Sequence, residues 1–186
     1  MTTRRWFSTI IVAGAALVAA GDRSLAAPPD APPDLRTLAE KFAPKGWELA
    51  SAVFARGVET YAPTAGAWVA KGATADLFAL ESTMKPKAER AGALFPGYQG
   101  LTWDFGTGRR AHESAEILEG ATGADIEWMR VTVRHFSDAG SSGGWSYILQ
   151  VHTRGGKAPT AAPAATDADW VGAPFTAYYV FLKPKR

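Results

Sequence analysis

Hydrophobic residues recur along most of the chain in short runs that glycine, proline or threonine separate. Runs of this length between turn residues are typical of β-strands. We expect strands at residues 49–56, 58–62, 67–71, 75–80, 101–105, 126–137, 144–154 and 174–182. Residues 84–97 show a weaker pattern, and residues 111–118 fit a helix by composition but a strand by their place in the series. About 8–9 short strands without alternating helices predict an all-β fold, either an antiparallel β-sandwich or a barrel.

A short helix is expected directly before the first strand. Asp34 is a suitable N-cap, and three apolar residues follow it at helical spacing, namely Leu35, Leu38 and Phe42. Pro44 should end the helix. Residues 27–46 are therefore predicted to be a proline-rich spacer with a short helix, and residues 47–186 a single β domain.

The first 26 residues have the pattern of a signal peptide. Arg4 and Arg5 precede an apolar stretch at residues 10–20, which is too short to span a bilayer. The small residues that end at Ala26 predict cleavage there. Because Trp6 and Phe7 follow the arginine pair, the segment also resembles a twin-arginine signal, with an ordinary secretory signal as the alternative. We expect a periplasmic or secreted protein with no membrane anchor after cleavage.

Charge and cysteine content exclude several classes of function. The whole chain carries a formal net charge of +2, but cleavage after Ala26 would leave 17 basic and 17 acidic residues. A neutral domain has no general attraction to nucleic acid or to anionic lipid. The absence of cysteine excludes a disulfide framework, a thiolate metal site and a cysteine nucleophile.

The sequence contains no catalytic constellation that spacing alone identifies. His112, His135 and His152 lack the spacing of metal ligands, and no G-x-S-x-G motif occurs. Residues 106–111 fit G-x-G-x-x-A, but strand patterns follow them, so we interpret them as a hairpin turn with Arg109 and Arg110 in solvent. We therefore predict no catalytic residue, no metal and no cofactor; whether the protein is an enzyme stays uncertain, with the balance against it.

The two strongest strands predict a candidate ligand platform. If Ser137 pairs with Trp145, Val131 and Val133 face Val151 and Leu149 toward the core. The other face then gathers the candidates for ligand binding, namely Trp128, Arg130, Arg134, His152 and Arg154. Arginine offers forked donors to an anion, and aromatic rings stack on sugars.

Two alternatives to this platform stay open. The same face would be an ordinary solvated surface if its arginines pair with carboxylates, and a register shifted by one residue would remove the platform. Trp103 is a further candidate, either for lining a pocket or for packing in the core.

Several segments together carry a family resemblance. They are Gly57-Val58-Glu59-Thr60-Tyr61, Ala67-Trp68, Gly100-Leu101-Thr102-Trp103, Ile126-Glu127-Trp128, Gln150-Val151-His152-Thr153-Arg154-Gly155-Gly156 and Pro174-Phe175-Thr176-Ala177-Tyr178. Over residues 47–182 this ordered series resembles the secreted bacterial and fungal domain of unknown function 3455 family. Both cysteines of that family fall on prolines here, Pro63 and Pro163. The resemblance implies that a family disulfide has been lost, and it predicts that the two prolines lie within about 7 Å of each other between Cα atoms.

The leading hypothesis is an exported, non-catalytic domain that binds a small anionic or sugar-like ligand or associates with the cell envelope. The alternative is an extracytoplasmic hydrolase that acts on envelope or extracellular material, and a third possibility is a purely structural surface protein. A deep pocket with a carboxylate beside a histidine would favour the hydrolase.

Overall fold

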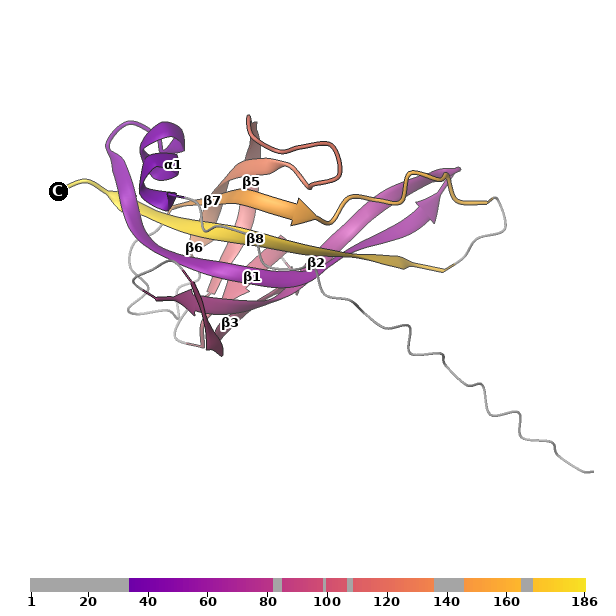
Figure 1. The fold of residues 1–186 in the computed structure, drawn as a ribbon, viewed down its shortest axis with the longest axis horizontal. Helices are drawn as coiled ribbons and strands as arrows, with labels where there is room; N and C mark the ends of the chain where they lie inside the picture. Colours follow the sequence, from indigo (N-terminus) through magenta and orange to yellow (C-terminus); the bar gives the residue numbers. More distant parts are fainter. Residues whose placement is uncertain (1–33, 82–84, 99, 107–108, 136–145, 165–168) are drawn as a thin grey trace, which may run out of the picture.

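The computed structural model describes residues 34–81, 85–98, 100–106, 109–135, 146–164 and 169–186. Within them the chain forms one helix, α1 (Leu35–Phe42), followed by a series of strands (Figure 1). The strands are β1 (Trp47–Thr64), β2 (Ala67–Leu80), β3 (Pro86–Gly97), β4 (Gly100–Asp104), β5 (Arg109–Leu118), β6 (Trp128–His135), β7 (Tyr147–Gly155) and β8 (Val171–Pro184). The expected signal peptide (residues 1–26) and the first part of the spacer (residues 27–33) lie outside the described residues.

The strands close into a barrel. Each strand pairs antiparallel with the next along the chain, and β8 returns to pair with β1. Closure leaves each barrel strand with a partner on both sides. The closed sheet confirms the predicted all-β fold with a short N-terminal helix. Of the two expected forms, sandwich and barrel, the chain adopts the barrel. No helix in the described part of the chain is long and apolar enough to cross a membrane.

β1 and β2 are both longer than the sequence pattern predicts, because each joins two of the expected short strands. β1 has 18 residues and continues through Gly57, where the pattern indicates a break. A Cβ atom at Gly57 would lie 2.1 Å from the carbonyl oxygen of Thr74 on β2. The glycine therefore permits a close approach of two backbones inside a continuous strand. Residues 111–118, left open between helix and strand, belong to β5.

The strands separate two apolar clusters, one on each side of the barrel wall. The inner cluster fills the barrel and includes Trp103, Phe175 and Tyr179. The outer cluster lies where α1 packs against β1, β7 and β8, with Leu35 and Ala39 of the helix buried. The carboxylate of Asp34 accepts hydrogen bonds from the backbone N–H groups of Arg36 and Thr37, which confirms the expected N-cap.

The predicted pairing of β6 with β7 is wrong by three residues. Val131 pairs with Ile148 instead of Val151, and Met129 pairs with Gln150. An odd shift exchanges the faces of one strand, so Leu149 and Val151 belong to the outer cluster. A bulge lies between Val151 and Arg154, where His152 has a positive φ of 50°. This bulge returns His152 to the outer side, where the sequence analysis expects it.

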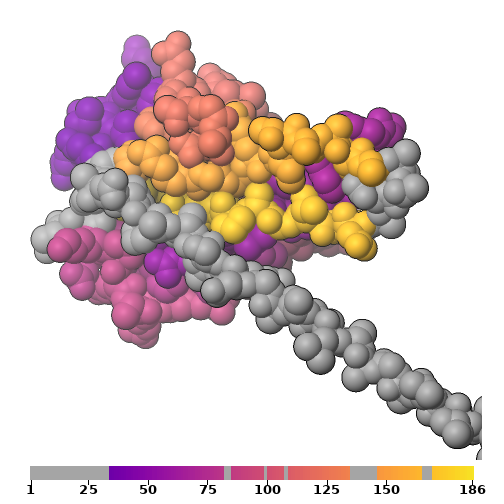
Figure 2. Space-filling model, turned by 45° about the vertical axis from the view of Figure 1, so that its right-hand side comes forward, coloured from indigo at the N-terminus to yellow at the C-terminus, as the bar shows by residue number. Residues whose placement is uncertain are grey.

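An arm projects from one end of the barrel, as Figure 2 shows. It consists of the β1–β2 hairpin, the start of β8 and the chain that follows β7. The indole of Trp68 donates a hydrogen bond to the carbonyl oxygen of Ala161 over 2.8 Å, and Trp68 is the register partner of Pro63. The segment of the buried Pro163 therefore lies against the hairpin that contains Pro63. The expected distance between the two prolines stays a prediction.

Candidate functional site

A row of polar residues crosses four neighbouring strands on the outer side of the barrel. Arg56 of β1 pairs in register with Asp76 of β2 on one side and with Thr176 of β8 on the other. Thr176 also pairs with Arg154 of β7. Because directly opposite residues share a face, these side chains form one continuous line, which we call the polar row.

Arg56 is the cation of the polar row that lacks an acidic partner. Its guanidinium carbon lies 6.0 Å from the centroid of the Phe78 ring. Its Nε is buried and makes no hydrogen bond, and no carboxylate of the described residues forms an ion pair with it. A buried donor without a partner costs about 1–3 kcal/mol, so the guanidinium of Arg56 is not fully satisfied within the described part of the chain.

Thr176, the neighbour of Arg56 on β8, also has a buried polar atom without a hydrogen-bond partner. Thr176 is fully buried, and its Oγ1 has no hydrogen-bond partner. Arg154, by contrast, donates to the Asp125 carboxylate over 3.3 Å. The unsatisfied groups of the polar row therefore lie next to each other on β1 and β8, away from the Arg154–Asp125 pair.

A shallow hollow of about 390 Å³ opens beside Arg56 over β1, β2 and β3. Thr74, Asp76 and Arg90 also line it. Arg90 donates to Asp76 over 2.9 Å, and both side chains are more than half exposed. The hollow thus contains two guanidinium groups and one carboxylate, so its wall has a net positive charge.

His152 lies at the other end of the outer face, between two aromatic rings. The ring centroids of Trp128 and Tyr178 are 6.5 Å and 5.9 Å from the imidazole. Burial lowers the pKa of His152, and nearby Arg154 lowers it further, so the neutral ring is favoured at pH 7. Its Nδ1 is buried without a hydrogen-bond partner.

No catalytic dyad forms at His152 among the described residues. Asp125 is the nearby carboxylate, but its oxygens accept from the Thr122 hydroxyl, the Gly155 N–H and Arg154. A histidine that acts as a general base needs a partner that orients it. Among the described residues, His152 therefore lacks the carboxylate contact that the hydrolase alternative would require at this histidine.

The structure brings together three of the predicted ligand-binding residues, whereas Arg130 and Arg134 pair with carboxylates of β5. Trp128 and His152 are in ring contact, and Arg154 follows at the end of the bulge. Arg130 pairs with Glu116 and donates to the carbonyl oxygen of Phe42. Arg134 pairs with Glu113 and is mostly exposed, so both of these arginines follow the solvated-face alternative.

Trp103, the remaining candidate, is fully buried inside the barrel. Its ring lies edge-on to Tyr179 with 5.5 Å between centroids, and its Nε1 has no hydrogen-bond partner. Trp103 therefore packs in the core, which is the second of the two roles considered for it.

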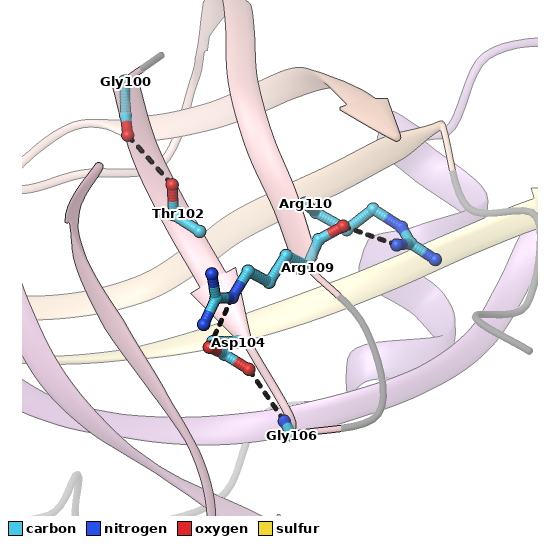
Figure 3. Close-up of polar contacts among 6 residues, drawn as sticks. All are labelled: Gly100, Thr102, Asp104, Gly106, Arg109 and Arg110. Atoms are coloured by element: carbon cyan, nitrogen blue, oxygen red, sulfur yellow. Dashed lines mark hydrogen bonds and ion pairs between the residues drawn. The ribbon is translucent and has the colours of Figure 1, made fainter. Parts of the chain in front are cut away.

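The β4–β5 turn differs in part from its interpretation as a solvent-exposed arginine pair (Figure 3). Asp104 accepts from the Gly106 N–H and from Arg109 Nε, each over 2.8 Å, which fixes one side of the turn. Arg110 is only 1% exposed, and its guanidinium donates to the carbonyl oxygen of Arg109. Because Arg110 pairs with Trp103, it shares the inner face, so the expectation of a solvated Arg110 is wrong.

One acidic residue inside the barrel escaped the sequence analysis. Glu59 of β1 pairs with Ala73 and Ala173, two positions beyond the inward-facing Gly57. Burial raises the pKa of Glu59 to about 7. Burial and the charge of Glu59 together raise the pKa of Tyr179. The only signal in the sequence is that Glu59 occupies an inward position of an alternating strand. Gly57, two residues earlier, suggested instead that the strand ends there.

A comparison with protein families finds one match over most of the described chain. The model of a family described as "Protein of unknown function (DUF3455)" matches residues 44–183. The match begins after α1 and covers the described barrel from β1 to the penultimate residue of β8. No curated protein and no solved structure matches the chain. The match confirms the resemblance carried by the ordered motifs.

Proposed function

We propose that this chain, which belongs to the DUF3455 family of proteins of unknown function, is a non-catalytic binding domain. Its ligand is a small anion with a carboxylate group, such as an acidic sugar, and the binding site is the hollow beside Arg56. The observation that carries the proposal is that Arg56 lines the hollow and forms no ion pair with a carboxylate of the described residues.

The chemistry of the hollow favours a planar anion. A guanidinium presents parallel N–H donors that match the two oxygens of a carboxylate. The Phe78 ring beneath Arg56 holds the guanidinium plane through a cation–π contact. Thr74 lines the same hollow and adds a hydroxyl that can bond to a sugar. The volume of about 390 Å³ suits a ligand of one or two rings.

A thermal-shift titration tests this proposal. The purified chain is titrated with galacturonate and, at equal ionic strength, with neutral galactose. A ligand that binds only the folded state raises the melting temperature. We expect galacturonate to raise the melting temperature of the wild type and galactose to raise it much less.

Matched arginine variants locate the effect. Arg56→Gln removes the unpaired guanidinium, whereas Arg134→Gln removes an exposed arginine that is paired with Glu113 on β5. The stabilisation by galacturonate should disappear in Arg56→Gln and persist in Arg134→Gln. Equal stabilisation of both variants, or none in the wild type, would refute the proposed site.

We also propose that the domain acts outside the cytoplasm. The support is the sequence alone: the arginine pair, the apolar stretch at residues 10–20 and the small residues before Ala27. Cell fractionation followed by N-terminal sequencing tests this. The proposal expects an extracytoplasmic protein that begins at Ala27, and a cytoplasmic protein with the intact N-terminus would contradict it.

A further inference from the structure

Three segments form one end of the barrel, and the last of them, at the end of β8, lies far from the other two in the sequence. The backbone N–H of Lys185 donates to the carbonyl oxygen of Gly46 over 2.8 Å. Trp47 pairs in register with Pro184, and Glu48 pairs with Lys183. The end of α1, the start of β1 and the end of β8 therefore lie side by side (Figure 1).

A hollow of about 360 Å³ lies between these segments. Three cationic side chains line it, one from each segment: Arg36 of α1, Lys45 of the loop that precedes β1, and Lys185 after β8. We call this the basic hollow. It is separate from the hollow beside Arg56, because the two share no lining residue.

The cations of the basic hollow outnumber the acids that line it. Glu40 and Glu48 are the acidic lining residues, and Glu48 lies 3.5 Å from Lys183 as an ion pair. Among the described residues no carboxylate forms an ion pair with Arg36, Lys45 or Lys185. A local positive excess is therefore concentrated at one end of a domain whose charges otherwise balance.

The backbone around the basic hollow does not neutralise this excess. Carbonyl oxygens at a helix end carry partial negative charge and repel an anion when they are free. Here the carbonyl of Ala39 accepts from the Ala43 N–H, and that of Phe42 accepts from Arg130. The carbonyl of Pro44 accepts from the Trp47 N–H. The carbonyls of Ala39, Phe42 and Pro44 are thus bonded within the chain rather than free.

An aromatic wall completes the basic hollow. Trp47 lines it and is fixed by an edge-on contact with Tyr147, with 4.7 Å between centroids and an interplanar angle of 88°. A rigid indole beside flexible cations can hold the carbon skeleton of a ligand while the cations hold its charge.

We propose that the basic hollow binds a phosphate group. Lysine is a point charge with three rotatable donors, which suits the oxygens of a tetrahedral anion that must be reached from several directions. Three cations on three separate segments provide such directions, whereas the Arg56 hollow has one guanidinium without an ion-pair partner, which suits a planar carboxylate. The phosphate can belong to a soluble ligand or to a lipid headgroup, and both present the same chemistry.

The test measures binding of inorganic pyrophosphate to the full chain by isothermal titration calorimetry. A second arm measures cosedimentation with vesicles that contain phosphatidylglycerol, with phosphatidylcholine vesicles as the reference. The double variant Lys45→Gln/Lys185→Gln removes two cations of the hollow. The double variant Lys71→Gln/Lys87→Gln removes the same charge from exposed positions on β2 and β3, and serves as the control.

We expect saturable pyrophosphate binding that weakens about tenfold or more in the first double variant and stays within about twofold in the control. Vesicle binding with the same variant pattern would support the proposal and assign the phosphate to a lipid. Binding of pyrophosphate alone would support it and assign a soluble ligand. An equal loss in both double variants, or no binding in either arm, would overturn it. Because the four lysines are exposed, circular dichroism spectra of the variants should match that of the wild type.

Discussion

Glu59 provides the sharpest quantitative prediction, because its carboxyl faces the barrel interior. Among the described residues, no hydrogen bond or ion pair to this carboxyl is present. Its pKa is about 7 in the folded protein against an ordinary value of 4.5, and the cause is burial. The folded state therefore holds the proton more tightly than the unfolded state does. The contribution of Glu59 to stability is fully present below about pH 4.5 and is lost as the pH rises through 7.

The size of the effect follows from this difference. One pKa unit corresponds to 1.36 kcal/mol, so the change from 4.5 to about 7 sets an upper limit of about 3 kcal/mol between pH 4.5 and pH 8. Glu59 is not fully buried, and residual contact with water reduces the penalty. We expect Glu59→Gln to be about 1–3 kcal/mol more stable than the wild type at pH 8 and nearly equal to it at pH 4.5.

Urea unfolding followed by tryptophan fluorescence at pH 4.5, 6, 7 and 8 measures this difference. Taking the difference between variant and wild type at each pH removes the contributions of other titrating groups, including His152. Glu89→Gln, at an exposed position of β3, is the control for removing a glutamate charge without changing the barrel interior. If the free-energy difference for Glu59→Gln is the same at every pH, the argument that burial raises this pKa is wrong.

Three further predictions concern the backbone and the lost disulfide. Gly57→Ala should destabilise the fold by more than about 3 kcal/mol, because the new Cβ would lie 2.1 Å from a backbone oxygen; urea unfolding checks this, and a loss below 1 kcal/mol would contradict it. His152→Val should cost about 1–2 kcal/mol more than His152→Asn, since a β-branched residue resists the φ of 50° that asparagine tolerates; equal losses in unfolding experiments would contradict the strain. Pro63→Cys/Pro163→Cys should form a disulfide, which non-reducing gels and thiol titration would detect. The disulfide would close a loop of about 100 residues and stabilise the folded state by up to about 4.7 kcal/mol. Thiols that stay free under oxidation would show that the two positions lie apart.

The sequence predicted the fold class because strand and helix signals are local. The N-cap at Asp34 and the alternating residues of β6 depend on near neighbours, and both are as expected. The predicted strand lengths were wrong because a glycine can either end a strand or permit close backbone contact inside one. Gly57 looks like a turn residue, yet it permits close contact inside a long strand, and only the partner strand decides between these roles.

The site was less predictable because it depends on pairing between distant strands. Arg56 and Thr176 are neighbours only through the β1–β8 ladder, which forms when the barrel closes. The register of β7 against β6 was wrong because it depended on the assumed pairing of Ser137 with Trp145. The bulge at His152 was a separate miss, since no glycine marks it. The outward position of Trp128 follows from the alternation of β6 alone, whereas His152 lies outward because the bulge and the odd register error cancel.

The same β1–β8 ladder builds both proposed sites, yet it keeps them independent. Trp47 at the basic hollow and Arg56 at the polar row are separated by nine positions of one extended strand. At about 3.3 Å per residue, this separation is about 30 Å. Surface charges are screened within about 8 Å at physiological ionic strength. A substitution at Lys45 or Lys185 should therefore leave galacturonate binding unchanged, and Arg56→Gln should leave pyrophosphate binding unchanged. If each variant weakened both ligands, the two hollows would not be separate sites, and the anion effects would have to come from the net charge of the domain.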